Sequence, residues 1–216
     1  MITSNQNQVS LNDKIYTLDL AFPLVFMCFD ILKDNILDQE ERLDTALFCF
    51  VSKEDLSDLS LQDKSKLLDK IFNKYIYTKE DKRRSELLSG EPKSFNFNQD
   101  WGLIYSSVLQ QYGVDLTDEH VRQTLTWKKL NALIDGLSDD TSFRKVTMYR
   151  TVKIDDKKMS DEQQEFYRKM KTVYALKPDK NSTGKLTNQE VAIILKPLDM
   201  IHKTMKLKEL RDQGRI

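Results

Sequence analysis

Hydrophobic residues along most of the chain recur at helical spacing, and this pattern predicts a mainly helical protein. In the segment 99–112, for example, five residues fall on one helix face: Trp101, Ile104, Tyr105, Val108 and Tyr112. Gly113 then stands where a left-handed helix C-cap is expected. Further helices are expected at 21–33, 39–51, 61–76, 118–135, 143–149, 160 to about 176, and beyond 187 with a break at Pro197.

Three of these expected helices have features of their own. The segment 21–33 is apolar nearly all round, which is typical of a helix buried on several sides, and Pro23 fits only in its first turn. In the segment 61–76, Leu61 is expected on the buried stripe. Helix 160–176 opens with the capping-box sequence that begins at Ser160.

The first residues follow a different pattern. Val9 and Leu11 alternate with polar residues before Asn12-Asp13, and Ile15 does so after that pair. Alternation on both sides of an Asn-Asp pair favours a short two-stranded hairpin. The sequence therefore predicts an all-α protein with a small N-terminal β-hairpin.

The same pattern divides the chain into four parts. Residues 1–77 are expected to form the hairpin with a helical cluster, and residues 99–176 a second helical region. Between them, residues 78–98 read as a charged connector that contains Gly90 and Pro92. Residues 177–216 are expected to form a C-terminal helical extension.

Composition excludes several classes of partner. The 216 residues include 34 basic and 34 acidic side chains, so no net field attracts nucleic acid or an anionic membrane. The most apolar stretch, 18–32, is interrupted by charges and Pro23, and is too short to cross a membrane. The first residues lack the pattern of a signal peptide, so we expect a cytoplasmic protein. The two cysteines, Cys28 and Cys49, lie in apolar helical patterns and are expected to be free and buried.

Catalytic chemistry is poorly supported. The histidines His120 and His202 are far apart, and no cysteine stands near either of them. No glycine lies within five residues of another, which excludes the common nucleotide-phosphate loops. Carboxylate pairs such as Asp139-Asp140 fall in polar connectors, where solvated charge is the simpler interpretation. We therefore expect no enzyme and no cofactor.

One segment of the extension follows the calcium loop of an EF-hand. Asp179, Asn181, Gly184 and Glu190 stand at loop positions 1, 3, 6 and 12. Position 5 is Thr183, a poor ligand, and a polar turn between helices accounts for the same residues. We expect no tight calcium site. A small regulatory calcium- or nucleic-acid-binding protein acting through residues 177–216 remains the alternative function.

The aromatic-rich stretch 95–117, together with 127–137 and 143–150, resembles a known family. It is similar to the tail assembly chaperones of siphophages and prophages of Gram-positive hosts, also called the gene-product-fifteen family. The resemblance covers about residues 9–176. The family usually has paired tryptophans where this chain has Thr126 and Trp127.

The resemblance implies a protein that binds the tape measure protein, keeps it soluble while the tail tube polymerises, and then leaves. It implies action in the host cytoplasm, absence from the mature virion, and no cofactor. The tail tube protein and further copies of this chain are additional expected partners. The candidate partner-binding residues are Trp101, Tyr105, Tyr112, Asp115 and Trp127. For the aromatic residues, core packing is the alternative to contact with a partner.

Overall fold

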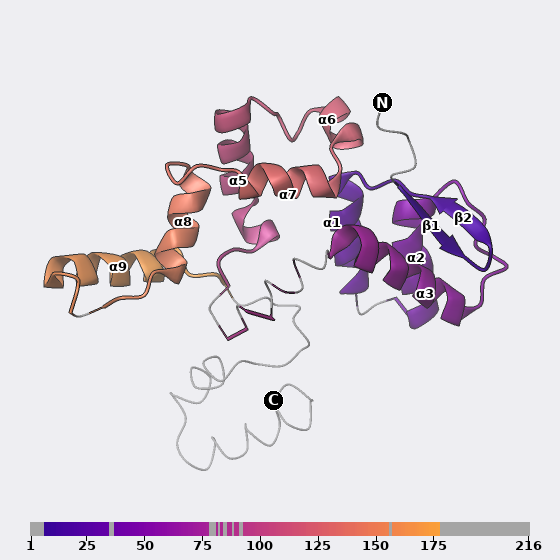
Figure 1. Ribbon diagram of the computed structural model, residues 1–216, viewed down its shortest axis with the longest axis horizontal. Helices are drawn as coiled ribbons and strands as arrows, with labels where there is room; N and C mark the ends of the chain where they lie inside the picture. Colours follow the sequence, from indigo (N-terminus) through magenta and orange to yellow (C-terminus); the bar gives the residue numbers. More distant parts are fainter. Residues whose placement is uncertain are drawn as a thin grey trace, which may run out of the picture. The chain divides into compact units, whose positions relative to one another are not determined.

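The computed structural model of the chain describes residues 7–34, 37–77, 81, 83, 86, 87, 89, 90, 93–155 and 157–177. Contacts divide the chain into two units, Met1–Leu176 and Lys177–Ile216, and every described helix and strand belongs to the first (Figure 1). These elements are helices and one hairpin, so the predicted fold class is confirmed. The helix expected beyond residue 187 lies outside the described residues.

The N-terminal hairpin pairs β1, Gln8–Leu11, with β2, Lys14–Thr17, in antiparallel register. Asn12 and Asp13 adopt φ angles of 49° and 61°, the left-handed conformation that a two-residue hairpin turn requires. One face of the hairpin is buried, and the side chains of the next helices hold its backbone. Tyr75, for example, donates its hydroxyl to the Gln8 carbonyl at 2.8 Å. The hairpin prediction is confirmed.

Three helices pack beside the hairpin: α1, Phe22–Leu32; α2, Gln39–Val51; and α3, Leu61–Ile71. Asp38 forms a capping box with Glu41 at the start of α2, and Ser60 accepts a backbone hydrogen bond at the start of α3. The helix expected over 61–76 widens into a π-helical turn, η1, Phe72–Ile76. Leu61 was expected in the buried stripe, but as the first residue of α3 it is 40% exposed.

The second part of the unit contains five helices among the described residues: α5, Phe97–Tyr112; α6, Glu119–Thr124; α7, Trp127–Asp135; α8, Ser142–Thr151; and α9, Asp161–Val173. A polar side chain caps the N-terminus of each, which satisfies backbone N–H groups that lack a helical partner. Gly113 ends α5 at φ 66°, as predicted, and its N–H donates to the Leu109 carbonyl.

The prediction of one helix over 118–135 is wrong, because the chain leaves the helix at Leu125. The Leu125 carbonyl accepts a hydrogen bond from the Phe22 N–H at 3.0 Å, and the Trp127 N–H donates to the Leu20 carbonyl at 2.9 Å. Ala21 and Thr126 thereby form an isolated antiparallel bridge. The break supplies backbone partners to the start of α1, and Thr126 then caps α7.

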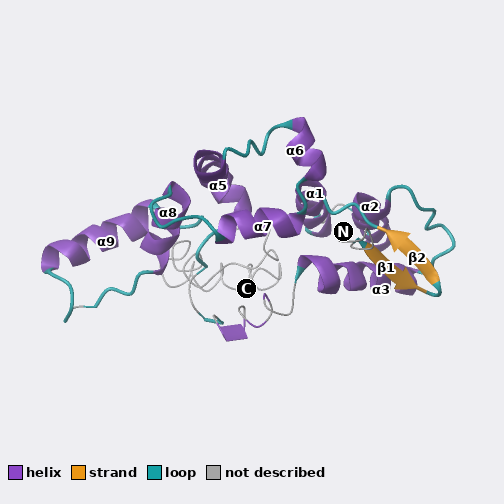
Figure 2. Cartoon of the chain, turned by 45° about the horizontal axis from the view of Figure 1, so that its top comes forward, coloured by secondary structure: helices purple, strands orange, loops and turns teal. Residues whose placement is uncertain are grey.

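The hydrophobic core is continuous between the two helical regions. Trp127 lies edge-on to both Phe26 and Phe29 of α1, with ring centroids 5.5 and 5.6 Å apart. Its indole N–H donates to the carbonyl of Ile76 at 3.3 Å, so the buried nitrogen has a partner. Figure 2 shows one end of α7 beside α1 and the other near α5, and α7 contacts both helices.

A buried ion pair joins α5 to α8. Arg150 contacts both carboxylate oxygens of Asp100, at 2.7 and 2.8 Å. The side chains are 9% and 3% exposed. Arg150 also donates to the Tyr174 carbonyl after α9 and to the Ser94 carbonyl before α5. One guanidinium therefore fixes four segments of the chain.

In the part of the chain that the structure describes, no helix is long and apolar enough to span a membrane.

Candidate functional site

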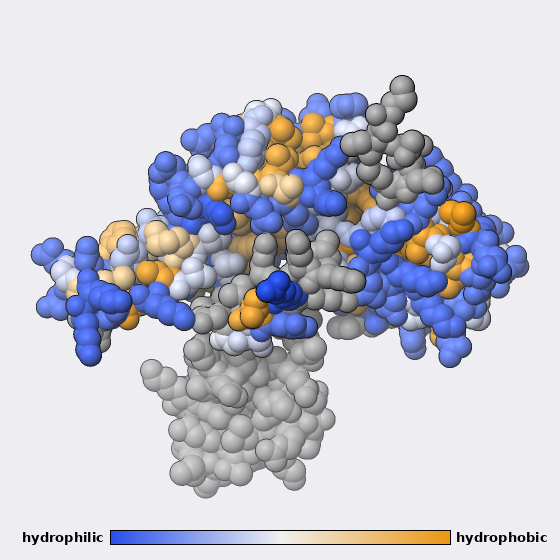
Figure 3. All heavy atoms as spheres, viewed as in Figure 1, coloured by the Kyte–Doolittle hydropathy of each residue, from blue (hydrophilic) through white to orange (hydrophobic). Residues whose placement is uncertain are grey.

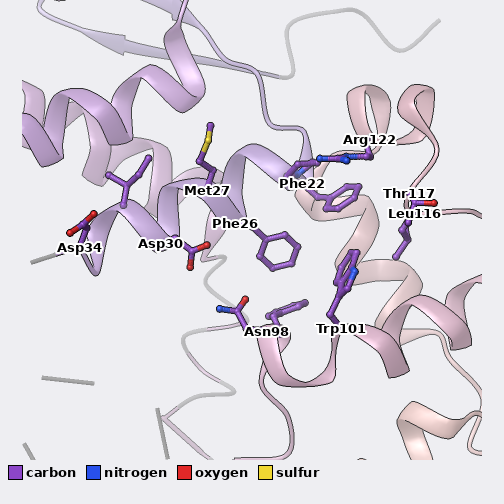
Figure 4. A pocket seen from close by; sticks show the side chains of 13 residues that line it. Phe22, Phe26, Met27, Asp30, Asp34, Asn98, Trp101, Leu116, Thr117 and Arg122 are labelled. Atoms are coloured by element: carbon purple, nitrogen blue, oxygen red, sulfur yellow. The ribbon is translucent and has the colours of Figure 1, made fainter. Parts of the chain in front are cut away.

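A groove runs between α1, α5 and the segment that connects α5 to α6 (Figure 4). Its volume is about 750 Å³. Phe22, Phe26 and Met27 line it from α1, Trp101 from α5, and Leu116 from the connecting segment. We call this feature the α1–α5 groove.

The helical spacing of α1 explains how this groove is built. Val25 and Cys28 are fully buried on the core side of α1. Asp30 and Ile31 follow Met27 by three and four residues, so the three side chains form a second face that lies along the groove. The prediction that this segment is buried on several sides is wrong for Met27, which is 45% exposed. The apolar residues on this face therefore line an accessible surface.

Stacked aromatic rings form the floor of the groove. The Phe22 and Trp101 rings stack with centroids 6.0 Å apart, and Phe26 meets Trp101 edge-on at 5.7 Å. Phe97, at the start of α5, lies edge-on to Phe26 at 5.2 Å. Interlocked rings of this kind hold one another in place, so the apolar floor exists before any partner arrives.

The two ends of the groove carry opposite charge. Asp30 lies near the C-terminal end of α1 and Asp34 just beyond that end, and Arg122 extends from α6 beside Phe22 (Figure 4). Asp30 and Arg122 are both exposed. The groove therefore has an acidic end, an apolar middle and a basic end.

The predicted partner-binding residues do not form one surface. Trp101 lies in the α1–α5 groove, whereas Trp127 is 6% exposed and packs in the core behind it. Tyr112, at the other end of α5, is 36% exposed. Its hydroxyl covers Gly136, 2.8 Å from where a β-carbon would stand. Trp127 is thus a core residue, and Trp101 is the only one of the five predicted partner-binding residues that lines the groove.

Asp115 organises the turn that carries Leu116 into the groove. Its carboxylate accepts hydrogen bonds from the Thr117 backbone at 2.8 Å and from the Thr117 hydroxyl at 2.6 Å. These bonds, with a further one from Tyr105, hold the pKa of Asp115 below its usual range. Asp115 and Tyr105 therefore act on the groove through the shape of its rim.

Residues that sequence reasoning did not single out complete the groove. Met27, Asp30 and Arg122 line it, although none of the three is among the predicted partner-binding residues. The available signal was the face of α1 on which Met27 and Asp30 recur with Ile31. That face is visible in the sequence, but its position opposite Trp101 is not.

The described residues give little support for metal or thiol chemistry. Among them, no group of three or more His, Cys, Asp or Glu side chains is placed to hold a metal ion. The EF-hand-like loop from Asp179 to Glu190 and the residue His202 lie outside the described part. Cys28 and Cys49 are free and buried, as predicted. Burial raises the pKa of Cys28 to about 12 and raises that of Cys49 as well.

Hydrophobic surface also gathers over α8 and α9 (Figure 3). Met148 is 41% exposed and Phe166 is 46% exposed, and Phe166 packs edge-on against Tyr149. A hollow of about 360 Å³ beside α8 is lined largely by polar residues, including Asp139 and Arg144. The α1–α5 groove is the larger and more apolar of these two hollows, so it is the stronger candidate site for an apolar partner.

Comparison with known proteins relates the chain to a bacteriophage family. A profile of the family described as Bacteriophage Gp15 protein matches residues 3–176. No curated protein and no solved structure matches the chain. The matched segment contains every described helix and strand, and with them the whole α1–α5 groove. The chain therefore belongs to the Bacteriophage Gp15 protein family.

Proposed function

We propose that this chain is a tail assembly chaperone that binds the tape measure protein and keeps it soluble while the tail tube is assembled. Membership in a bacteriophage family and the resemblance of residues 95–150 to tail assembly chaperones support this role. The observation that carries it is the α1–α5 groove, an apolar surface with a rigid aromatic floor and polar ends.

A tape measure protein is the kind of client that such a surface suits. Its long helices present apolar stripes, and stripes of this kind aggregate when nothing covers them. A groove with an apolar middle takes the apolar face of one helix, while the polar face of that helix stays in water. Met27, Phe26 and Trp101 would supply this contact, since each lines the groove.

The proposed role also requires release, because the client must become enclosed by the tail tube. One groove of this size gives moderate affinity, so several copies of the chain would hold one long client through avidity. The tail tube protein would then displace the copies one at a time. On this proposal the chain acts in the host cytoplasm and leaves before the virion is complete.

Co-expression with the tape measure protein tests the proposal. The unmodified chain should move this client into the soluble fraction and co-purify with it in several copies. Met27→Asp should abolish both effects, because it places a charge in the apolar middle of the groove. Met148→Asp is the matched control, since Met148 lies on α8 and is 41% exposed, against 45% for Met27.

Two outcomes would count against this account in different ways. A client that is equally insoluble with and without the unmodified chain refutes the chaperone role. If Met27→Asp keeps the client as soluble as the unmodified chain does, the groove is not the surface that binds the client. The circular dichroism spectra of both variants should match that of the unmodified chain. Both methionines are exposed in the unmodified chain, so replacing them does not disturb the core.

A further inference from the structure

The charges of the α1–α5 groove point to a more specific occupant. We infer that the groove binds an amphipathic helix of about three turns that is basic at one end and acidic at the other. The basic end lies against Asp30, and the acidic end lies against Arg122. That this helix belongs to the tape measure protein rests on the proposed function, whereas its charge pattern follows from the groove itself.

The length of the bound segment follows from α1. Groove-lining residues extend along this helix from Phe22 to Ile31. At a rise of 1.5 Å per residue this span is roughly 14 Å, which a parallel helix covers with about 10 residues. Such a helix presents three or four apolar side chains to Phe26, Met27 and Trp101.

The direction of the bound helix follows from the two ends. Asp30 is exposed at one end, and Arg122 is exposed at the other end. Reversing a helix of this polarity would bring its basic residues to Arg122 and its acidic residues to Asp30. An exposed ion pair is worth roughly threefold in affinity, and the factors for the two ends multiply, so together they should favour one direction by about tenfold.

Two synthetic peptides of about 15 residues test this inference on the full chain. Both carry the same leucine stripe and the same numbers of lysine and glutamate. In the polar peptide the lysines stand at one end and the glutamates at the other, and in the mixed peptide they alternate. The polar peptide should bind about tenfold more tightly by fluorescence anisotropy at low salt. High salt should remove most of this difference, because exposed charges are screened.

Variants of the chain test whether Asp30 and Arg122 cause the preference for the polar peptide. Asp30→Asn combined with Arg122→Gln should reduce the affinity for the polar peptide to that for the mixed peptide. Asp69→Asn is the control, because Asp69 is an exposed carboxylate on α3 outside the groove. A photo-crosslinking residue at the basic end of the bound peptide should capture α1 near Ile31, and one at the acidic end should capture α6.

The inference is overturned if the two peptides bind equally well, or if the preference survives the double substitution. It also fails if neither peptide binds while the unmodified chain still solubilises the tape measure protein, a result that leaves the proposed function standing. The reverse result, tight binding of the polar peptide without any rescue of that client, supports the inference and refutes the proposed function.

Discussion

Replacing Arg150 by methionine tests how α5 and α8 are held together. Methionine keeps most of the side-chain volume but removes the guanidinium that contacts Asp100 at 2.7 and 2.8 Å. The side chain of Asp100 is 3% exposed, so its carboxylate would stay buried without its counter-charge. Breaking a buried pair from one side costs about 3–5 kcal/mol. The lost bonds to the Tyr174 and Ser94 carbonyls act in the same direction.

Urea unfolding followed by the fluorescence of Trp101 and Trp127 measures this cost. The control is Lys169→Met, which breaks a pair with Glu165 that is also 2.8 Å long but whose side chains are 68% and 66% exposed. The control should leave the unfolding midpoint unchanged, because an exposed pair contributes little. If Arg150→Met shifts the unfolding midpoint no more than Lys169→Met does, burial does not make the Arg150–Asp100 pair more stabilising than an exposed pair.

Two further predictions concern stability. Gly102→Ala should stabilise the chain by about 0.5–1 kcal/mol, because Gly102 lies inside α5 with open space where a β-carbon would stand. Gly113→Ala should destabilise it by about 1–2 kcal/mol, because φ is 66° there, and thermal unfolding of both variants checks the opposite signs. Burial raises the pKa of Cys28 from 9.0 to about 12, so above pH 9 the thiol ionises in the unfolded chain but stays protonated in the folded one. The free energy of unfolding should therefore fall as the pH rises above 9, and this fall should be smaller in Cys28→Ala. If the free energy of unfolding falls equally steeply with pH in Cys28→Ala and in the unmodified chain, Cys28 is not the source of the pH dependence.

Local chemistry explains what could be predicted from the sequence. The hairpin turn depends on Asn12 and Asp13 alone, since these residue types tolerate the left-handed conformation that the turn requires. The helices starting after Asp38 and Ser160 are likewise fixed by capping boxes only four residues long. Such features are complete within one turn of the chain, so no tertiary information is needed to find them.

Tertiary pairing explains what could not be predicted. Leu125 leaves the helix because its carbonyl accepts the N–H of Phe22, a residue far earlier in the sequence. Trp127 faces inward because the Ile76 carbonyl is there to accept its indole N–H. The groove has the same origin, since Met27 and Trp101 line one hollow only after α1 and α5 have packed. Periodicity in the sequence identifies the apolar face of each helix, but it does not show which face of another helix packs against it.

Hydrogen exchange on the complex with the tape measure protein tests the central claim most directly. Binding of a client helix should slow amide exchange in α1 and in the first turns of α5, with smaller changes in the connecting segment around Leu116. The α8 and α9 amides should exchange at the rates seen in the free chain. Protection confined to α8 and α9, with α1 unchanged, would show that the client binds elsewhere and would contradict the account.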